Sequence, residues 1–171
     1  MDGLRLFLAL WPDEALRARL ADASQTLHAA CGGRRLKPAT LHLTLCFLGD
    51  TPLERVPDIC HALESIAMPD LRLRLTRFGH WAPGIGWIGP HGTPAGLAAL
   101  VAEIRSRLDR AGIAYDRRPF RPHLTLLRQA GRPLQLPPAP SLDWSADGFE
   151  LIESMPGPAG PDYRLRQRFP A

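Results

Sequence analysis

The chain has 171 residues and a mass of 18.9 kDa, which excludes folds such as the TIM barrel that need roughly 250 residues. Its 45% hydrophobic and 22% charged residues are typical of a globular protein and argue against a chain disordered throughout. The net charge of +4 is compatible with an anionic ligand such as phosphate or nucleic acid but does not require one.

Three cysteines, Cys31, Cys46 and Cys60, form no CxxC pair. This pattern argues against a disulfide scaffold or a structural zinc site and favours a reducing compartment, so we expect a cytoplasmic protein. Asp2 stands where a signal peptide carries a basic residue, and the sequence predicts neither a signal peptide nor a membrane span.

Hydrophobic patterning in the first half predicts a buried strand over 4–10, followed by a helix that starts at Pro12-Asp13-Glu14 and ends at Gly32-Gly33. A second strand is expected over 41–48, and Thr51 is expected to cap a helix over about 53–66. In residues 71–76 leucine alternates with Arg72, Arg74 and Thr76, which predicts a half-buried strand with a basic outer face.

The second half begins with a hairpin turn near 81–84 and a partner strand over 85–89. Thr93 is expected to cap a helix that begins at Pro94 and stops at Gly112. A strand over 123–127, a proline-rich loop over 131–141 and strands near 149–154 and 163–169 complete the chain. The order of elements departs from βαβα alternation, which predicts an α+β fold with largely antiparallel sheets.

The tetrapeptide His-Leu-Thr-Leu occurs twice, at 42–45 and at 123–126, each time in a predicted strand. Because residues two apart in a strand share a face, each copy presents its imidazole and hydroxyl on one side and buries its leucines on the other. Two strands that meet across a pseudo-twofold axis would surround one cavity with two histidines and two threonines. Two imidazoles can serve as acid and base near neutral pH, and hydroxyls can bind phosphate oxygens.

Ordinary packing is the alternative to a functional role for a His-x-Thr pattern. Packing explains the leucines, but it does not require histidine and threonine at matching places in two strands. A metal site is less favoured, because neither copy has a third histidine, cysteine or carboxylate at a ligand spacing. The sequence therefore predicts paired acid–base chemistry with no metal and no cofactor.

The duplicated motif resembles that of the two-histidine (2H) phosphoesterase superfamily, and within it the RNA 2′,3′-cyclic phosphodiesterases, also called 2′-5′ RNA ligases. The likeness extends nearly from end to end, with two motif blocks at 41–49 and 118–128. It implies one two-lobed domain over 1–171, with pseudo-twofold symmetry, two mainly antiparallel sheets flanked by helices, and a central cleft. It also implies metal-independent hydrolysis of a terminal 2′,3′-cyclic phosphate to a 2′-phosphomonoester.

The resemblance assigns the roles of the motif residues. His42 would be the proton donor to the leaving 3′ oxygen, and His123 the proton acceptor that activates water. Thr44, Thr125 and Arg128 would hold the phosphate. Arg128 lies five residues after His123, an odd offset that would place it on the opposite face of a regular strand, so its role requires a bend or the strand end. The residues themselves, rather than the resemblance, suggest Phe47, Arg118 and Phe120 as substrate contacts, and core packing is the alternative for the two phenylalanines.

The expected substrate is RNA with a 2′,3′-cyclic phosphate end or a small cyclic nucleotide, and the reverse reaction would be 2′-5′ RNA ligation. Two alternatives stay open: another 2H phosphoesterase acting on 2′-5′ oligoadenylates, an ADP-ribose cyclic phosphate or RNA 3′ ends, and a non-catalytic module that binds RNA ends. The second alternative depends on the basic residues Arg34, Arg35, Lys37, Arg72, Arg74, Arg117, Arg118 and Arg121. Few aromatic residues interleave with them, and a solvated surface explains them about as well. We expect a monomer.

Overall fold

Ten strands and three α-helices are formed by residues 2–170, the part of the chain that the computed structural model describes. The helices are α1 (Glu14–Cys31), α2 (Val56–Leu63) and α3 (Ala95–Arg110). The strands are β1 (Gly3–Leu10), β2 (Arg34–Arg35), β3 (Leu43–Pro52), β4 (Leu71–Leu75), β5 (Arg77–Trp81), β6 (Ile85–Gly89), β7 (Leu124–Arg128), β8 (Leu142–Ala146), β9 (Phe149–Met155) and β10 (Asp162–Phe169).

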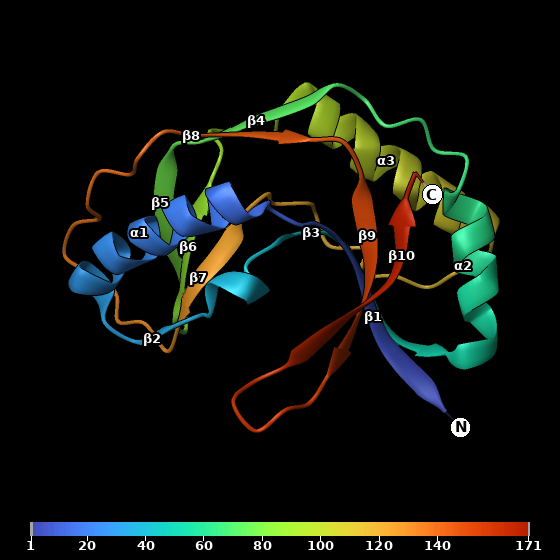
Figure 1. Cartoon of the computed structure of the whole chain (residues 1–171), viewed down its shortest axis with the longest axis horizontal. Helices are drawn as coiled ribbons and strands as arrows, with labels where there is room; N and C mark the ends of the chain where they lie inside the picture. The colour runs from blue at the N-terminus through green and yellow to red at the C-terminus, as the bar shows by residue number, and fades with distance from the viewer. Residues whose placement is uncertain (1, 171) are drawn as a thin grey trace.

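Eight of the strands form one antiparallel sheet in the order β10-β9-β1-β3-β7-β6-β5, with β2 paired to β7. Its centre is narrow, because the ladder that joins β3 to β7 consists of the pair Leu43–Leu124. The sheet thus divides into two four-stranded halves, which correspond to the two mainly antiparallel sheets that the family resemblance implies. A separate two-stranded sheet pairs β4 with β8 along one edge of the molecule (Figure 1).

Each half of the sheet packs against its own helix layer. Helix α1 contacts β7 and β2, whereas α3 contacts β3 and α2 packs against α3 (Figure 1). Leucines at helical spacing, including Leu16, Leu20 and Leu27, bury the inner face of α1, and the Asp13 carboxylate caps the helix by accepting the Leu16 N–H at 2.8 Å. The expected bilobed α+β architecture is confirmed.

Several local predictions are wrong. Thr51 caps no helix: it is a buried residue of β3, and its hydroxyl donates to the Gly49 carbonyl at 3.1 Å. The cap position of α3 is Pro94 rather than Thr93, without a side-chain hydrogen bond. The strands β2 and β8 were missed: β2 has only two residues, too few for a periodic signal, and β8 is stabilised by β4, a partner far along the chain.

The two motif strands share an irregularity at the same place. The register of β3 against β1 leaves Leu45 as an extra residue, and the register of β7 against β6 leaves Leu126 as an extra residue. Such a β-bulge opposes two residues to one and re-aims the side chains that follow it. Each bulge thus falls on the second leucine of a His-Leu-Thr-Leu motif.

Candidate active site

The two motif histidines lie at the junction of the two half-sheets. His42 directly precedes β3 and His123 directly precedes β7, and the next residue of each strand forms the Leu43–Leu124 pair. Both rings line one cavity of about 190 Å³. The remaining lining residues are Leu36, Thr40, Thr44, Thr125, Arg128 and Tyr163. All five residues predicted to act on the phosphate therefore meet in one place.

The bulges explain which side chains reach this cavity. Before each bulge the strands alternate, so the leucines next to the histidines and threonines are fully buried in the core. The extra residue then reverses the alternation, and the position five residues after each histidine returns to the cavity face. This places Arg128 beside Thr125, as its expected role requires, and it places Phe47 on the same face as Thr44.

Each histidine is oriented by a backbone carbonyl two residues before it. His42 Nδ1 lies 2.7 Å from the Thr40 carbonyl oxygen, and His123 Nδ1 lies 2.7 Å from the Arg121 carbonyl oxygen. A carbonyl can only accept, so Nδ1 carries a proton in both rings and Nε2 is the nitrogen left for chemistry. Each Nε2 can then accept a proton when its ring is neutral and donate one when the ring is charged.

Aromatic rings surround His42 closely. Trp11 stacks on the imidazole with ring centroids 4.8 Å apart and an interplanar angle of 9°, Phe7 lies at 4.9 Å and 30°, and Tyr163 meets it edge-on at 5.2 Å. None of these three residues was predicted from the sequence to be part of the site. Phe7 and Trp11 had a signal in the sequence, because they continue a period of two along β1 and the residue that follows it, whereas Tyr163 lies on β10 and had none.

Burial sets the protonation of both histidines. Burial lowers the pKa of His42 to about 4, against the opposing effect of its hydrogen bond to the Thr40 carbonyl, and the charges of His123 and Arg128 lower it further. Burial likewise lowers the pKa of His123, which its bond to the Arg121 carbonyl opposes. Both rings are thus biased toward the neutral form before any anion enters the cavity.

A groove of about 540 Å³ adjoins the histidine cavity and shares Thr44 and His123 with it. Phe47, Arg118 and Phe120, the predicted substrate contacts, all line this groove, together with Trp81, Arg105 and Arg121. It combines apolar rings with guanidinium groups, as a nucleotide requires.

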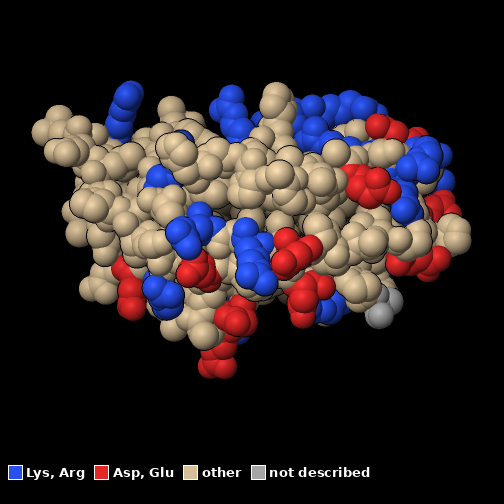
Figure 2. Space-filling model, turned by 90° about the horizontal axis from the view of Figure 1, so that it is seen from above, with Lys and Arg blue, Asp and Glu red and all other residues tan. Residues whose placement is uncertain are grey.

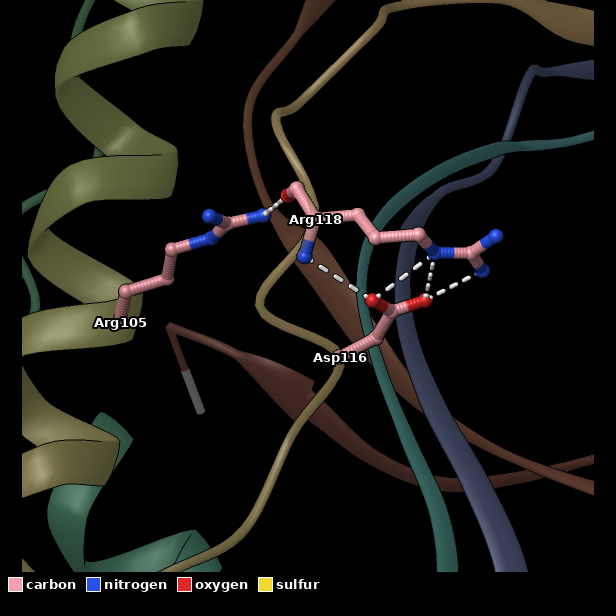
Figure 3. A network of polar contacts seen from close by, with 3 residues as sticks. All are labelled: Arg105, Asp116 and Arg118. Carbon is pink, nitrogen blue, oxygen red and sulfur yellow. Dashed lines mark hydrogen bonds and ion pairs between the residues drawn. The ribbon is translucent and has the colours of Figure 1, made fainter.

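One wall of the groove is fixed by a polar network. The Arg118 guanidinium and its backbone N–H donate to the Asp116 carboxylate, and Arg105 donates to the Arg118 carbonyl oxygen at 2.9 Å (Figure 3). The hydrogen bonds from Arg118 hold the pKa of Asp116 at about 2, so this carboxylate stays ionised. The Asp116 N–H also donates to the Phe47 carbonyl oxygen at 2.8 Å, which ties the 115–121 segment to β3.

Other arginines considered as nucleic-acid contacts are engaged elsewhere. Arg72 and Arg74 on β4 pair with Asp70 and Asp143, on a face where basic and acidic side chains interleave (Figure 2). Arg117 pairs with Asp109. For these three arginines, a role in a solvated and ion-paired surface describes the structure better than contact with RNA does.

Residues 2–170 contain neither a metal-binding cluster nor a membrane-spanning helix. No group of three or more His, Cys, Asp or Glu side chains lies close enough together to hold a metal ion. None of the helices in that range is long and apolar enough to cross a membrane.

Comparison with known proteins shows the family. The model of the LigT like phosphoesterase family matches the chain twice, over residues 10–87 and 88–163. The chain belongs to the LigT-like phosphoesterases. The two matches each contain one His-Leu-Thr-Leu motif, in agreement with the pseudo-twofold arrangement of the half-sheets.

Individual LigT-like proteins resemble the chain over most of its length. It is 33% identical to the RNA 2′,3′-cyclic phosphodiesterase of Thermus thermophilus, covering 97% of this chain and 89% of that protein. It is 34% identical to the Escherichia coli protein of the same name, covering 82% and 80%. The crystal structure of E. coli LigT complexed with 3′-AMP superimposes with a TM-score of 0.87 at 29% identity, covering 98% of both chains.

Proposed function

We propose that this LigT-like phosphoesterase hydrolyses RNA 2′,3′-cyclic phosphate ends to 2′-phosphomonoesters. One observation carries the proposal: two histidines, each fixed at Nδ1 by a backbone carbonyl, share a cavity with two threonine hydroxyls and one guanidinium. That set of groups suits a phosphodiester, which needs a base, an acid and donors for its non-bridging oxygens. The names of the relatives agree with this substrate class.

In the proposed mechanism His123 Nε2 takes a proton from water, whose oxygen forms the new bond to phosphorus. The bond from phosphorus to the 3′ oxygen breaks, and His42 Nε2 gives its proton to that oxygen. The product keeps the phosphate on the 2′ oxygen, and one further proton exchange with solvent restores both rings. Each positioned acid or base contributes roughly 10²–10⁴-fold to the rate.

The phosphate itself is held by groups that neither gain nor lose a proton during the reaction. Thr44 and Thr125 donate hydroxyl hydrogens to the non-bridging oxygens, and Arg128 neutralises their charge. Donors fixed before the reaction stabilise the charge that develops on these oxygens without reorganising. Phe47, Phe120 and Arg118 would contact the nucleotide that carries the phosphate, because their groove opens from the same cavity.

The same site would also serve related reactions. By microscopic reversibility the same two histidines could join a cyclic phosphate end to a 5′-hydroxyl, giving 2′-5′ RNA ligation without ATP. A 2′-5′ oligoadenylate, an ADP-ribose cyclic phosphate, an RNA 3′ end or a small cyclic nucleotide would fit the same phosphate cavity. One two-lobed domain over 1–171, a monomeric state and a cytoplasmic location remain predictions; the two family matches support the first of these.

A metal-free assay tests the proposed function. With EDTA present, a nucleoside 2′,3′-cyclic phosphate and a short RNA with the same end should both be hydrolysed, and the product should be the 2′-phosphate isomer, identified by ³¹P NMR. Hydrolysis of another phosphodiester in a parallel panel, but of neither of these, would move the assignment to another substrate of the superfamily. Tight RNA binding without any turnover would favour the binding module.

The pH dependence of kcat/KM follows from the lowered histidine pKa values. The acid must be charged and is lost as pH rises through its pKa, whereas the base must be neutral and is lost as pH falls through its pKa. Since both pKa values lie below that of a free histidine, the bell-shaped profile should have its basic limb below about pH 6.5.

The kcat profile should lie at higher pH, because the bound phosphate anion favours both charged rings. A kcat/KM profile whose basic limb lies above the pKa of a free histidine would contradict this assignment.

A further inference from the structure

Trp11 makes the most nearly parallel aromatic contact within residues 2–170, and its partner is His42. The ring centroids are 4.8 Å apart and the planes differ by 9°. Trp11 follows β1 directly, on the face of that strand that also carries Phe7 and Ala9. Trp11 is half-buried, it has no part in the proposed proton transfers or phosphate binding, and it does not line the groove beside His123.

We propose that Trp11 is a positioning residue for His42: its indole face fixes the imidazole plane so that Nε2 stays aimed at the phosphate. The inference rests on the proposed function, because it assigns a role in that reaction. Trp11 touches the catalytic ring and acts through it.

The carbonyl bond alone cannot fix the ring. The bond from Nδ1 to Thr40 holds one atom, and the torsion that rotates an imidazole is broad. A flat indole stacked on the ring, together with Phe7 at 4.9 Å and Tyr163 edge-on at 5.2 Å, removes the rotation that would turn Nε2 away from the phosphate. A displacement of about 1 Å at a reacting atom can cost roughly 10²-fold in rate.

The stack also acts on the charge of His42. Burial disfavours the imidazolium, and the positive charges of His123 and Arg128 on the β7 side disfavour it as well. The negative π-face of an indole favours a cation placed against it, so Trp11 opposes these effects when His42 must carry the proton that it donates. The other titratable groups nearby are Tyr163, which lines the cavity, and Glu150 of β9 and Asp162 of β10, which line a groove together with Trp11 and Tyr163.

The two histidines differ in this respect. Trp81 lies 4.5 Å from His123, but its plane is inclined by 68°, so no flat face covers that ring. The parallel stack is found at the histidine assigned as the acid, where support for the charged form is needed. The assigned base has an inclined contact instead.

Trp11 could instead bind substrate directly. It also lines two grooves, of about 900 and 530 Å³, neither of which shares a lining residue with the groove beside His123. A nucleobase stacked there would make Trp11 a binding residue. That role would appear in KM, whereas a positioning role appears in kcat.

The test compares Trp11→Leu, which keeps apolar bulk without a flat face, with the conservative Trp11→Phe. Steady-state kinetics on a 2′,3′-cyclic nucleotide should show kcat reduced about 10- to 100-fold in Trp11→Leu at nearly constant KM, and largely restored in Trp11→Phe. Thermal unfolding confirms that both variants are folded. A rise in KM at unchanged kcat would overturn the proposal in favour of a nucleobase platform.

A titration of the histidine rings by NMR gives a second readout that needs no turnover. Trp11→Leu should lower the pKa of His42, since the ring stays dry but loses the π-face, while Trp11→Phe should stay near wild type. His123 is the internal control and should not shift. If kcat and the His42 titration are both unchanged in Trp11→Leu, the inference is wrong. If the wild-type protein hydrolyses no cyclic phosphate, the proposed function fails instead, and the titration still decides whether Trp11 controls His42.

Discussion

Replacing His42 or His123 by asparagine should lower kcat on a 2′,3′-cyclic phosphate by at least roughly 100-fold and up to about 10⁴-fold. Asparagine can place an amide nitrogen near the position of Nδ1 and keep the bond to the Thr40 or Arg121 carbonyl, but it has nothing at the position of Nε2. The variants should therefore fold and bind substrate while losing the proton transfer. Rapid-quench or steady-state hydrolysis assays measure the effect.

The matched control is His61→Asn. His61 lies on α2 with 86% of its side chain exposed, and it lines neither the histidine cavity nor the adjoining groove. It should retain wild-type kcat. Near-wild-type activity in either motif variant would refute the acid–base assignment.

The same pair of variants separates acid from base. Residual kcat/KM of His42→Asn should lose the basic limb of its pH profile, because no acid is left to deprotonate. Residual kcat/KM of His123→Asn should lose the acidic limb, because no base is left to protonate. The opposite pattern would exchange the two roles while keeping the site.

Replacing Arg128 by methionine should lower kcat/KM by roughly 10²–10³-fold, the usual cost of removing one fixed donor to a developing oxyanion. Arg128 is the one lysine or arginine among the residues that line the cavity. Methionine keeps much of the length and removes the charge, whereas Arg128→Lys should recover part of the loss because it keeps the charge without the fork.

Removal of the Arg128 charge should also change the pH profile. That charge lowers the pKa of His42, so its loss should raise this pKa and shift the kcat/KM profile as a whole toward higher pH. Arg132→Met removes an equal charge from the exposed loop after β7. This variant should change neither the value of kcat/KM nor its pH profile. An Arg128→Met enzyme with unchanged kcat/KM would show that the phosphate is held by the threonines alone.

Much of the site could be read from the sequence because its signal is local. His-Leu-Thr-Leu in an extended strand fixes which side chains share a face, whatever surrounds the strand. The duplication then required two such faces, and the structure places His42, Thr44, His123 and Thr125 around one cavity. The longer helices could also be predicted from the sequence, since residues such as Leu16, Leu20 and Leu27 of α1 repeat at helical spacing.

The failures share a different cause. Thr51 has the side chain of a helix cap, but β3 continues through it because β1 supplies backbone partners. The strand β8 exists because β4, about seventy residues earlier, pairs with it. In both cases a partner distant in sequence outweighs the local preference, and a single sequence does not show that partner.

The sequence by itself thus determined the fold class, the four motif residues and the chemistry that they can perform, because strand periodicity and side-chain type are local properties. The tertiary structure alone decided how Arg128 and Phe47 reach the cavity face. A bulge is a mismatch in the pairing of two strands, so it cannot be identified from the sequence of one strand. It also decided that Trp11, Phe7 and Tyr163 enclose His42, because β1 and β10 reach that ring only once the sheet is assembled. The pKa of His42 follows from that enclosure, since burial is a property of the packed protein.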